Sequence, residues 1–131
     1  MGIVVFISYA TKDAEAFYIK WIAEQLRKKP KVDKVLIWEE DAHGSIIKYM
    51  EESVNECDVF LLFCSKNALH SDPMRTEWET AQYLKKKIIP IFTSTDHVPT
   101  LLKRLRGIRF RANDLRGTLD ELYHEILKVL E

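Results

Sequence analysis

The sequence has little of what several common classes of protein require. Its 131 residues include four glycines and two cysteines, and 20 basic residues balance 20 acidic ones. A chain with no net charge has no general attraction for nucleic acid or for an anionic membrane, so neither is an expected partner. The apolar run Val59–Cys64 is far too short to cross a bilayer, and Met1 precedes a strand rather than the basic segment of a signal peptide. We therefore expect a cytoplasmic protein.

The two cysteines stand at either end of one apolar run. This placement favours free, buried thiols at Cys57 and Cys64 over a disulfide bridge. A catalytic cysteine is the less favoured alternative, because no histidine lies near either thiol in the sequence. The four histidines form no short metal-ligand motif, so no metal site is predicted.

The scarcity of glycine also excludes familiar nucleotide-binding loops. The turn after the first predicted strand, Ser8–Asp13, contains no glycine, whereas a dinucleotide-binding fold of the oxidoreductase kind needs a glycine-rich turn there. A phosphate loop with glycines followed by Lys-Ser or Lys-Thr is also absent. The residues that end the first and third strands are not acidic, which argues against the cation site of a phospho-accepting receiver domain.

What is present is a regular alternation of strands and helices. Apolar runs predict strands at Ile3–Ile7, Val35–Trp38, Val59–Cys64 and Ile88–Phe92, and Ile108–Phe110 is expected to form a short edge strand. The proline inside the fourth of these removes one hydrogen-bond donor, so we expect that strand near the edge of the sheet. The pattern predicts an α/β fold with an open, mostly parallel sheet and helices on both faces.

Helical periodicity follows the strands. Asp13 is expected to cap a first helix that extends to Leu26, and Ser45 is expected to cap a second. After a polar loop at 65–73, a third helix is predicted from about 74 to 86. A short helix is expected within 98–105, and a clear apolar period marks a last helix over 115–129.

Several of these segments together resemble the TIR (Toll/interleukin-1 receptor) domain family. Phe6–Asp13 resembles its first sequence box, and the acidic loop that ends in Gly44 resembles its BB loop. Cys57–Leu62 resembles its third strand, and Ser71–Ala81 followed by Ile88–Ile91 resembles its third helix and fourth strand. Four boxes in the right order indicate one TIR domain of the prokaryotic type over residues 1–131.

The resemblance implies a flavodoxin-like fold with five parallel strands and one of two functions. Many family members cleave NAD+ to nicotinamide and ADP-ribose or a cyclic form of it, and act when the domains self-associate. We expect this activity here, in immune or stress signalling, with NAD+ as the substrate and with no cofactor. The alternative is a non-enzymatic module that binds other TIR domains.

The feature that separates the two functions is a glutamate on the third helix. The resemblance places the family's catalytic glutamate at Glu77 rather than at Glu79. Nicotinamide leaves as a neutral base, so the reaction needs no general acid, and one carboxylate beside the developing oxocarbenium ion is enough. The alternative is an ordinary carboxylate in an early turn of a helix, where it interacts favourably with the helix dipole.

Further substrate-binding residues are expected around this glutamate. The edge beyond the first strand presents Ser8, Tyr9, Ala10 and Lys12, of which Lys12 is either a phosphate ligand or a solvated lysine. Trp38 is a stacking aromatic for NAD+ or a core residue. The resemblance adds Ser71 at the start of the third helix.

The acidic loop implies a role in gating or assembly. In the family this loop gates the crevice and takes part in self-association, which assigns Asp41, His43 and Gly44 to that role. Its negative charge is expected to face solvent or a basic patch on a neighbouring subunit. Such a patch is available at Lys103, Arg104, Arg106, Arg109 and Arg111, although a solvated face is the simpler reading and nucleic-acid binding another.

Overall fold

The computed structural model describes residues 2–37 and 46–131, with side chains from Glu51 onward in the second range. Within these residues, five strands form one sheet in the order β2-β1-β3-β4-β5. Every neighbouring pair is parallel, which confirms the predicted flavodoxin-like α/β fold. The strands are β1 (Ile3–Ser8), β2 (Val32–Ile37), β3 (Val59–Cys64), β4 (Lys87–Phe92) and β5 (Ile108–Arg109).

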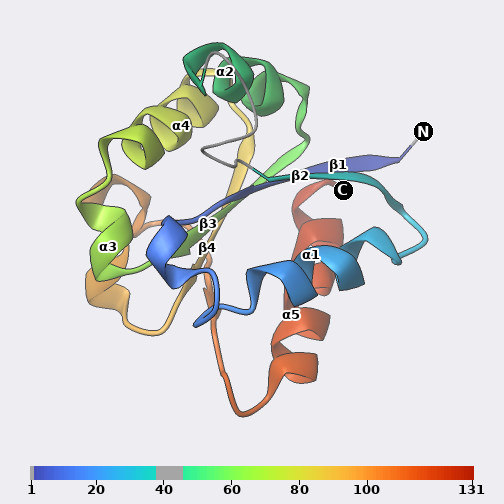
Figure 1. The fold of residues 1–131 in the computed structure, drawn as a ribbon. Coiled ribbons are helices and arrows are strands. Elements are labelled where there is room, and N and C mark those ends of the chain that lie inside the picture. Colours follow the sequence, from blue (N-terminus) through green and yellow to red (C-terminus); the bar gives the residue numbers. More distant parts are fainter. Residues whose placement is uncertain (1, 38–45) are drawn as a thin grey trace.

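Helices cover both faces of this sheet. Figure 1 shows two of them, α1 and α5, on one face and the other three on the opposite face. The helices are α1 (Ile19–Arg27), α2 (Ile46–Glu56), α3 (Lys66–Leu69), α4 (Asp72–Tyr83) and α5 (Leu115–Val129). Three short 3-10 helices, η1 (Thr11–Asp13), η2 (Thr95–His97) and η3 (Thr100–Leu102), lie in the connections.

The central strands have apolar side chains on both faces. In β1, Val5 and Ile7 enter the cluster beneath α1 and α5, whereas Phe6 enters the cluster beneath α2 and α4. All six residues of β3 are buried, because both of its faces are covered. Each fully buried valine, leucine, isoleucine or phenylalanine side chain contributes about 1.5–3 kcal/mol to the stability of the fold. The alternation continues to Ser8, which shares the face of Phe6.

The first helix begins later than predicted. Residues 11–13 form η1, residues 14–18 form turns, and α1 starts only at Ile19. The amides of Phe17, Tyr18 and Ile19 bond to carbonyls four, three and five residues earlier, so no regular helical ladder can form there. Tyr18 has a left-handed backbone, with φ of 51°. Asp13 therefore does not cap α1, and the buried Phe17 projects from a turn.

The predicted polar loop at 65–73 contains a short helix. Ser65 caps α3 by accepting a hydrogen bond from the amide of Ala68, 2.9 Å away. Ser71 caps α4 in the same way, through the amide of Met74 at 3.3 Å. With Pro73 in its first turn, α4 begins at Asp72 and ends at Tyr83, earlier at both ends than predicted.

The strand that contains Pro90 lies near the edge of the sheet, as predicted. This strand, β4, lies next to the edge strand β5, and their pairing begins at Ile91, just after the missing donor. At the other edge, β2 begins three residues earlier than predicted, at Val32. The predicted helix within 98–105 is represented by η3, and the last helix, α5, spans the predicted residues.

Candidate functional site

The strand order reverses at β1. The chain passes from β1 to β2 on one side and then returns to β3 on the other. In open parallel sheets, ligands bind beyond the carboxyl ends of the strands at such a reversal. In β1 that end is Ser8, which is fully buried and lies in register with Leu62 of β3.

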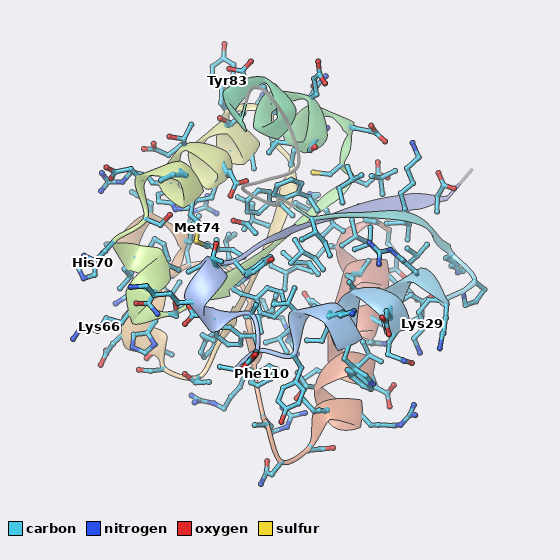
Figure 2. The ribbon with its side chains drawn as sticks, viewed as in Figure 1. Lys29, Lys66, His70, Met74, Tyr83 and Phe110 are labelled. Atoms are coloured by element: carbon cyan, nitrogen blue, oxygen red, sulfur yellow. The ribbon has the colours of Figure 1, made fainter. Side chains whose placement is uncertain are left out.

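Glu77 lies on the buried face of α4. The buried residues of this helix are Met74, Glu77, Trp78 and Ala81, a spacing of three, four and seven residues from the first. In Figure 2, Met74 points from α4 into the interior, whereas Tyr83 projects away from the molecule. Glu77 therefore occupies a core position, and the neighbouring Trp78 packs in the apolar cluster on the same face of the sheet. The exposed Glu79 belongs to the opposite side of the helix.

Ser8 and Glu77 form a buried hydrogen-bonded pair. The Ser8 hydroxyl donates to Oε1 of Glu77 over 2.7 Å, across 69 positions of sequence. The second carboxylate oxygen, Oε2, is also buried and has no hydrogen-bond partner among the described residues. Burial raises the pKa of Glu77 from 4.5 to about 8, and the hydrogen bond from Ser8 opposes that rise. A carboxyl group of this kind is a typical candidate for a functional site.

Asp13 connects the ends of β1 and β3. Its carboxylate accepts hydrogen bonds from the hydroxyl of Ser65 and, over 2.9 Å, from the side-chain amide of Asn67. Ser65 directly follows β3, and Asn67 lies in α3. The segment after β1 is thereby held against the start of α3. The prediction of Asp13 as a helix cap missed this contact, because it joins residues far apart in the sequence.

The other predicted substrate-binding residues that the structure describes lie in different surroundings. Tyr9 packs against the cluster beneath α1 and α5, and so lies on the other face of the sheet from Ser8. Ala10 packs against the cluster that contains α4, and Lys12 is exposed in η1. The hydroxyl of Ser71 is engaged in capping α4. Their roles toward a substrate remain predictions.

Four further predicted residues lie outside the described residues: Trp38, Asp41, His43 and Gly44. The acidic loop that contains three of them is therefore not placed relative to Glu77. Its predicted role in gating or assembly stays a prediction.

The predicted basic patch is only partly free. Arg106 pairs with Glu125, and Arg111 pairs with Glu121 and Asp114. Arg109 donates to the carbonyl of Thr93 and lies over the ring of Phe92. Within the described part of the chain, this leaves Lys103 and Arg104 with neither an ion pair nor a side-chain hydrogen bond.

The two cysteines are poor candidates for a nucleophile. Cys57 and Cys64 are free and buried, as predicted, and burial raises the pKa of each thiol to about 12.

Within residues 2–37 and 51–131, no three or more acidic, histidine or cysteine side chains gather in a metal-binding group. None of the helices described is both long and apolar enough to cross a membrane.

Solved structures with the same fold include two TIR domains. The TIR domain of the Toll-related receptor TRR-2 from Hydra magnipapillata has 18% identity and a TM-score of 0.74, with 93% of this chain and 96% of that chain covered. The TIR domains of the activated Roq1 resistosome, which recognises the pathogen effector XopQ, have 13% identity and a TM-score of 0.75, over 95% and 99% of the two chains.

The fold is also shared with an enzyme. The CMP N-glycosidase BcmB from Clostridium botulinum has 21% identity and a TM-score of 0.66, with 93% of this chain and 98% of that chain covered. At these identities the likeness shows a common fold alone. A sequence search of curated proteins finds no match.

The sequence itself identifies the family. The family model described as TIR domain matches residues 5–125, which include β1 with Ser8 and α4 with Glu77. The chain therefore belongs to the TIR domain family.

Proposed function

We propose that this TIR domain cleaves the bond between nicotinamide and ribose in NAD+, with Glu77 as the essential carboxylate. The observation that carries the proposal is the environment of Glu77. Its side chain is 2% exposed at the strand-order reversal, one carboxylate oxygen accepts from Ser8, and the other has no partner among the described residues. A folded protein does not leave a buried carboxylate oxygen unpaired without cost, so Oε2 is available for a ligand hydroxyl.

The reaction suits a single carboxylate. The bond between ribose C1′ and the pyridinium nitrogen breaks, and its electron pair goes to the nitrogen, so nicotinamide leaves as a neutral molecule. The ribose carries the positive charge in the transition state, which a nearby carboxylate stabilises. Water then adds to C1′ and loses a proton, which gives ADP-ribose. In a cyclic product, a nitrogen of the adenine base takes the place of water.

The charge state of Glu77 couples substrate binding to proton release. With a pKa of about 8, the carboxyl group is mostly protonated at neutral pH in the free domain. A pyridinium cation close to the carboxyl group favours the ionised form. Bound NAD+ therefore lowers the pKa of Glu77 and generates the carboxylate that the transition state needs.

We further propose that the domains act as an assembly. In the single chain Glu77 is almost inaccessible, so the site must open as NAD+ binds for the carboxyl group to meet a ribose. Contact between domains can supply the energy for that opening. The Roq1 structure is that of an activated resistosome with its TIR domains, which supports assembly as the active state of a domain with this fold.

Two proteins with a similar structure support the proposal that the bond broken is one between a sugar and a base. The Clostridium protein is named as a CMP N-glycosidase. A 2-deoxyribosyltransferase from Leishmania mexicana shares the fold with 18% identity and a TM-score of 0.55, over 70% of this chain and 65% of that chain. Both names describe reactions at the sugar of a nucleoside or nucleotide.

The burial of Glu77 also favours a second candidate, the non-enzymatic interaction module. In that case Ser8 and Glu77 form a structural pair that joins β1 to α4, and no substrate reaches them. Nicotinamide release from NAD+ distinguishes the two candidates. The assay compares the native chain with Glu77→Gln, at high protein concentration and with a crowding agent that promotes assembly.

Glu79→Gln is the matched control, since Glu79 is an exposed carboxylate on the same helix. We expect Glu77→Gln to abolish release and Glu79→Gln to retain it, with both variants folded by circular dichroism. No release from the native chain in any assembled state would favour the interaction module. Equal release from all three proteins would mean that Glu77 is not the catalytic group.

A further inference from the structure

A cationic cavity lies at the opposite edge of the sheet from Glu77. It has a volume of about 370 Å³ and opens at the amino end of β4, whereas Ser8 marks the carboxyl end of the parallel strand β1. Three segments surround it: the turn from α4 to β4, the segment before β5, and the last turns of α5. The polar residues that line it include Gln82, Lys85, Lys87, Arg104, Arg106 and Glu125.

Three of these cationic side chains are unpaired. Lys85, Lys87 and Arg104 have no ion-pair partner within residues 2–37 and 51–131. The neighbouring Lys86 donates to the carbonyl of Asn55 over 2.8 Å. The positive charge is local to this cavity, because the net charge of the whole chain is zero. All three residues are exposed, and an anion bound between them would offset the repulsion among like charges from two separate segments.

The backbone at Lys85 adopts a left-handed conformation beside the cavity. Lys85 has φ of 59°, a left-handed conformation that favours glycine. It follows α4 in a helix-ending motif, in which its amide bonds to the carbonyl of Gln82 and the next amide, of Lys86, bonds to that of Ala81. Glycine is the usual residue at this position of the motif. A lysine there is unfavourable for folding, and such strain is typical of functional positions.

A buried carboxylate holds one wall of the cavity. The side chain of Glu125, from α5, is 7% exposed, and its Oε1 lies 3.4 Å from Nε of Arg106. This contact fixes the segment before β5 against α5 and leaves Arg104, two residues earlier, on the cavity wall. Ile88, Leu105 and Val129 supply an apolar part of the lining.

We propose that this cavity binds a small anion with two or more phosphoryl groups. Lysine and arginine are the side chains that proteins use for phosphate oxygens, and three unpaired cations match more charge than one phosphoryl group carries. The volume is in the range of small-ligand sites. The inference is independent of NAD+ cleavage, because it uses no residue of the Glu77 site.

The test is the binding of inorganic pyrophosphate by isothermal titration calorimetry, in the absence of NAD+. The variants are Lys85→Gly with Arg104→Gln, singly and together. Glycine suits the left-handed backbone at position 85, so the first substitution removes the cation without disturbing the fold. Lys66→Gln is the control, since Lys66 is an exposed lysine that points outward from α3 in Figure 2.

We expect the native chain to bind pyrophosphate, the double variant to bind it at least about tenfold more weakly, and the control to match the native chain. A parallel titration with ADP separates two sources: tighter binding than pyrophosphate indicates a nucleotide, and equal binding a simple phosphate chain. The proposal is overturned if native protein does not bind pyrophosphate at millimolar concentration, if the double variant binds equally well, or if only a long oligonucleotide binds.

Discussion

Ser8 and Glu77 are 69 positions apart in the sequence and form a buried hydrogen bond of 2.7 Å. The serine ends β1, and the glutamate projects from the buried face of α4. Because that face is otherwise apolar, the serine is the one described group that hydrogen-bonds to the carboxyl group, and it reaches only Oε1. Burial raises the pKa of Glu77 and the hydrogen bond from Ser8 opposes that rise, and the predictions on activity and pH follow from these two effects.

The first prediction concerns the pH dependence of NAD+ cleavage, and it rests on the proposed function. Burial raises the pKa of Glu77 to about 8, and the transition state needs the ionised form. kcat/KM for nicotinamide release should therefore increase with pH up to about 8, by about tenfold per unit on the acidic limb, and then level off. The measurement covers pH 6 to 9.5, and a flat profile would contradict it.

The second prediction is that Ser8→Ala moves the acidic limb of the kcat/KM profile to higher pH. The hydrogen bond from Ser8 lowers the pKa of Glu77, so its loss raises that pKa further. Hydrogen bonds to charged groups contribute about 1.5–3 kcal/mol, so kcat/KM at pH 7 should fall by about tenfold or more and recover at high pH. Ser53→Ala, at a buried serine of α2, is the control. An equal loss at every pH would indicate a structural role for Ser8.

The third prediction is that Glu77→Gln stabilises the fold at alkaline pH. The folded-state pKa is raised to about 8 from an ordinary 4.5, so the protonated form favours folding. This stabilisation is complete below 4.5 and is lost as the pH rises toward 8, at about 1.4 kcal/mol per pH unit. The glutamine variant has no such loss.

Urea unfolding at pH 4.5 and pH 8.5 measures this difference. The two proteins should have similar free energies of unfolding at the lower pH, and the variant should be more stable by several kcal/mol at the higher one. A constant difference between them across this range would show that Glu77 titrates normally in the folded state.

The fourth prediction concerns the connection between the ends of β1 and β3. Asp13→Ala removes the acceptor for Ser65 and Asn67, and should lower the free energy of unfolding by about 1–3 kcal/mol. A double-mutant cycle with Asn67→Ala isolates the 2.9 Å contact, which should show a coupling of about 0.5–1 kcal/mol. Additive effects of the two substitutions would mean that this contact contributes nothing to stability.

The fifth prediction concerns the thiols. Burial raises the pKa of Cys57 and Cys64 to about 12, so neither is a thiolate at pH 8. A thiol reagent such as dithionitrobenzoate should react slowly with the native chain and with both cysteines after unfolding in urea. Rapid reaction of one thiol in the native chain would place it at an accessible surface.

The sequence by itself determined the fold and the family. Unbroken apolar runs such as Val59–Cys64 mark strands covered on both faces, because only such strands can bury every residue. The family's motifs indicate the candidate glutamate. Its interior position is also indicated by the helical spacing of Met74, Glu77, Trp78 and Ala81.

Only the tertiary structure decided what surrounds that glutamate. The partner of Glu77 is Ser8 because the alternation of β1 turns this serine toward α4, and the partners of Asp13 are Ser65 and Asn67. The convergence of Lys85, Lys87 and Arg104 on one cavity likewise depends on how two loops meet α5. Hydrogen bonds and charges act over a few ångströms in space, whereas local patterns in a sequence report only on neighbours along the chain.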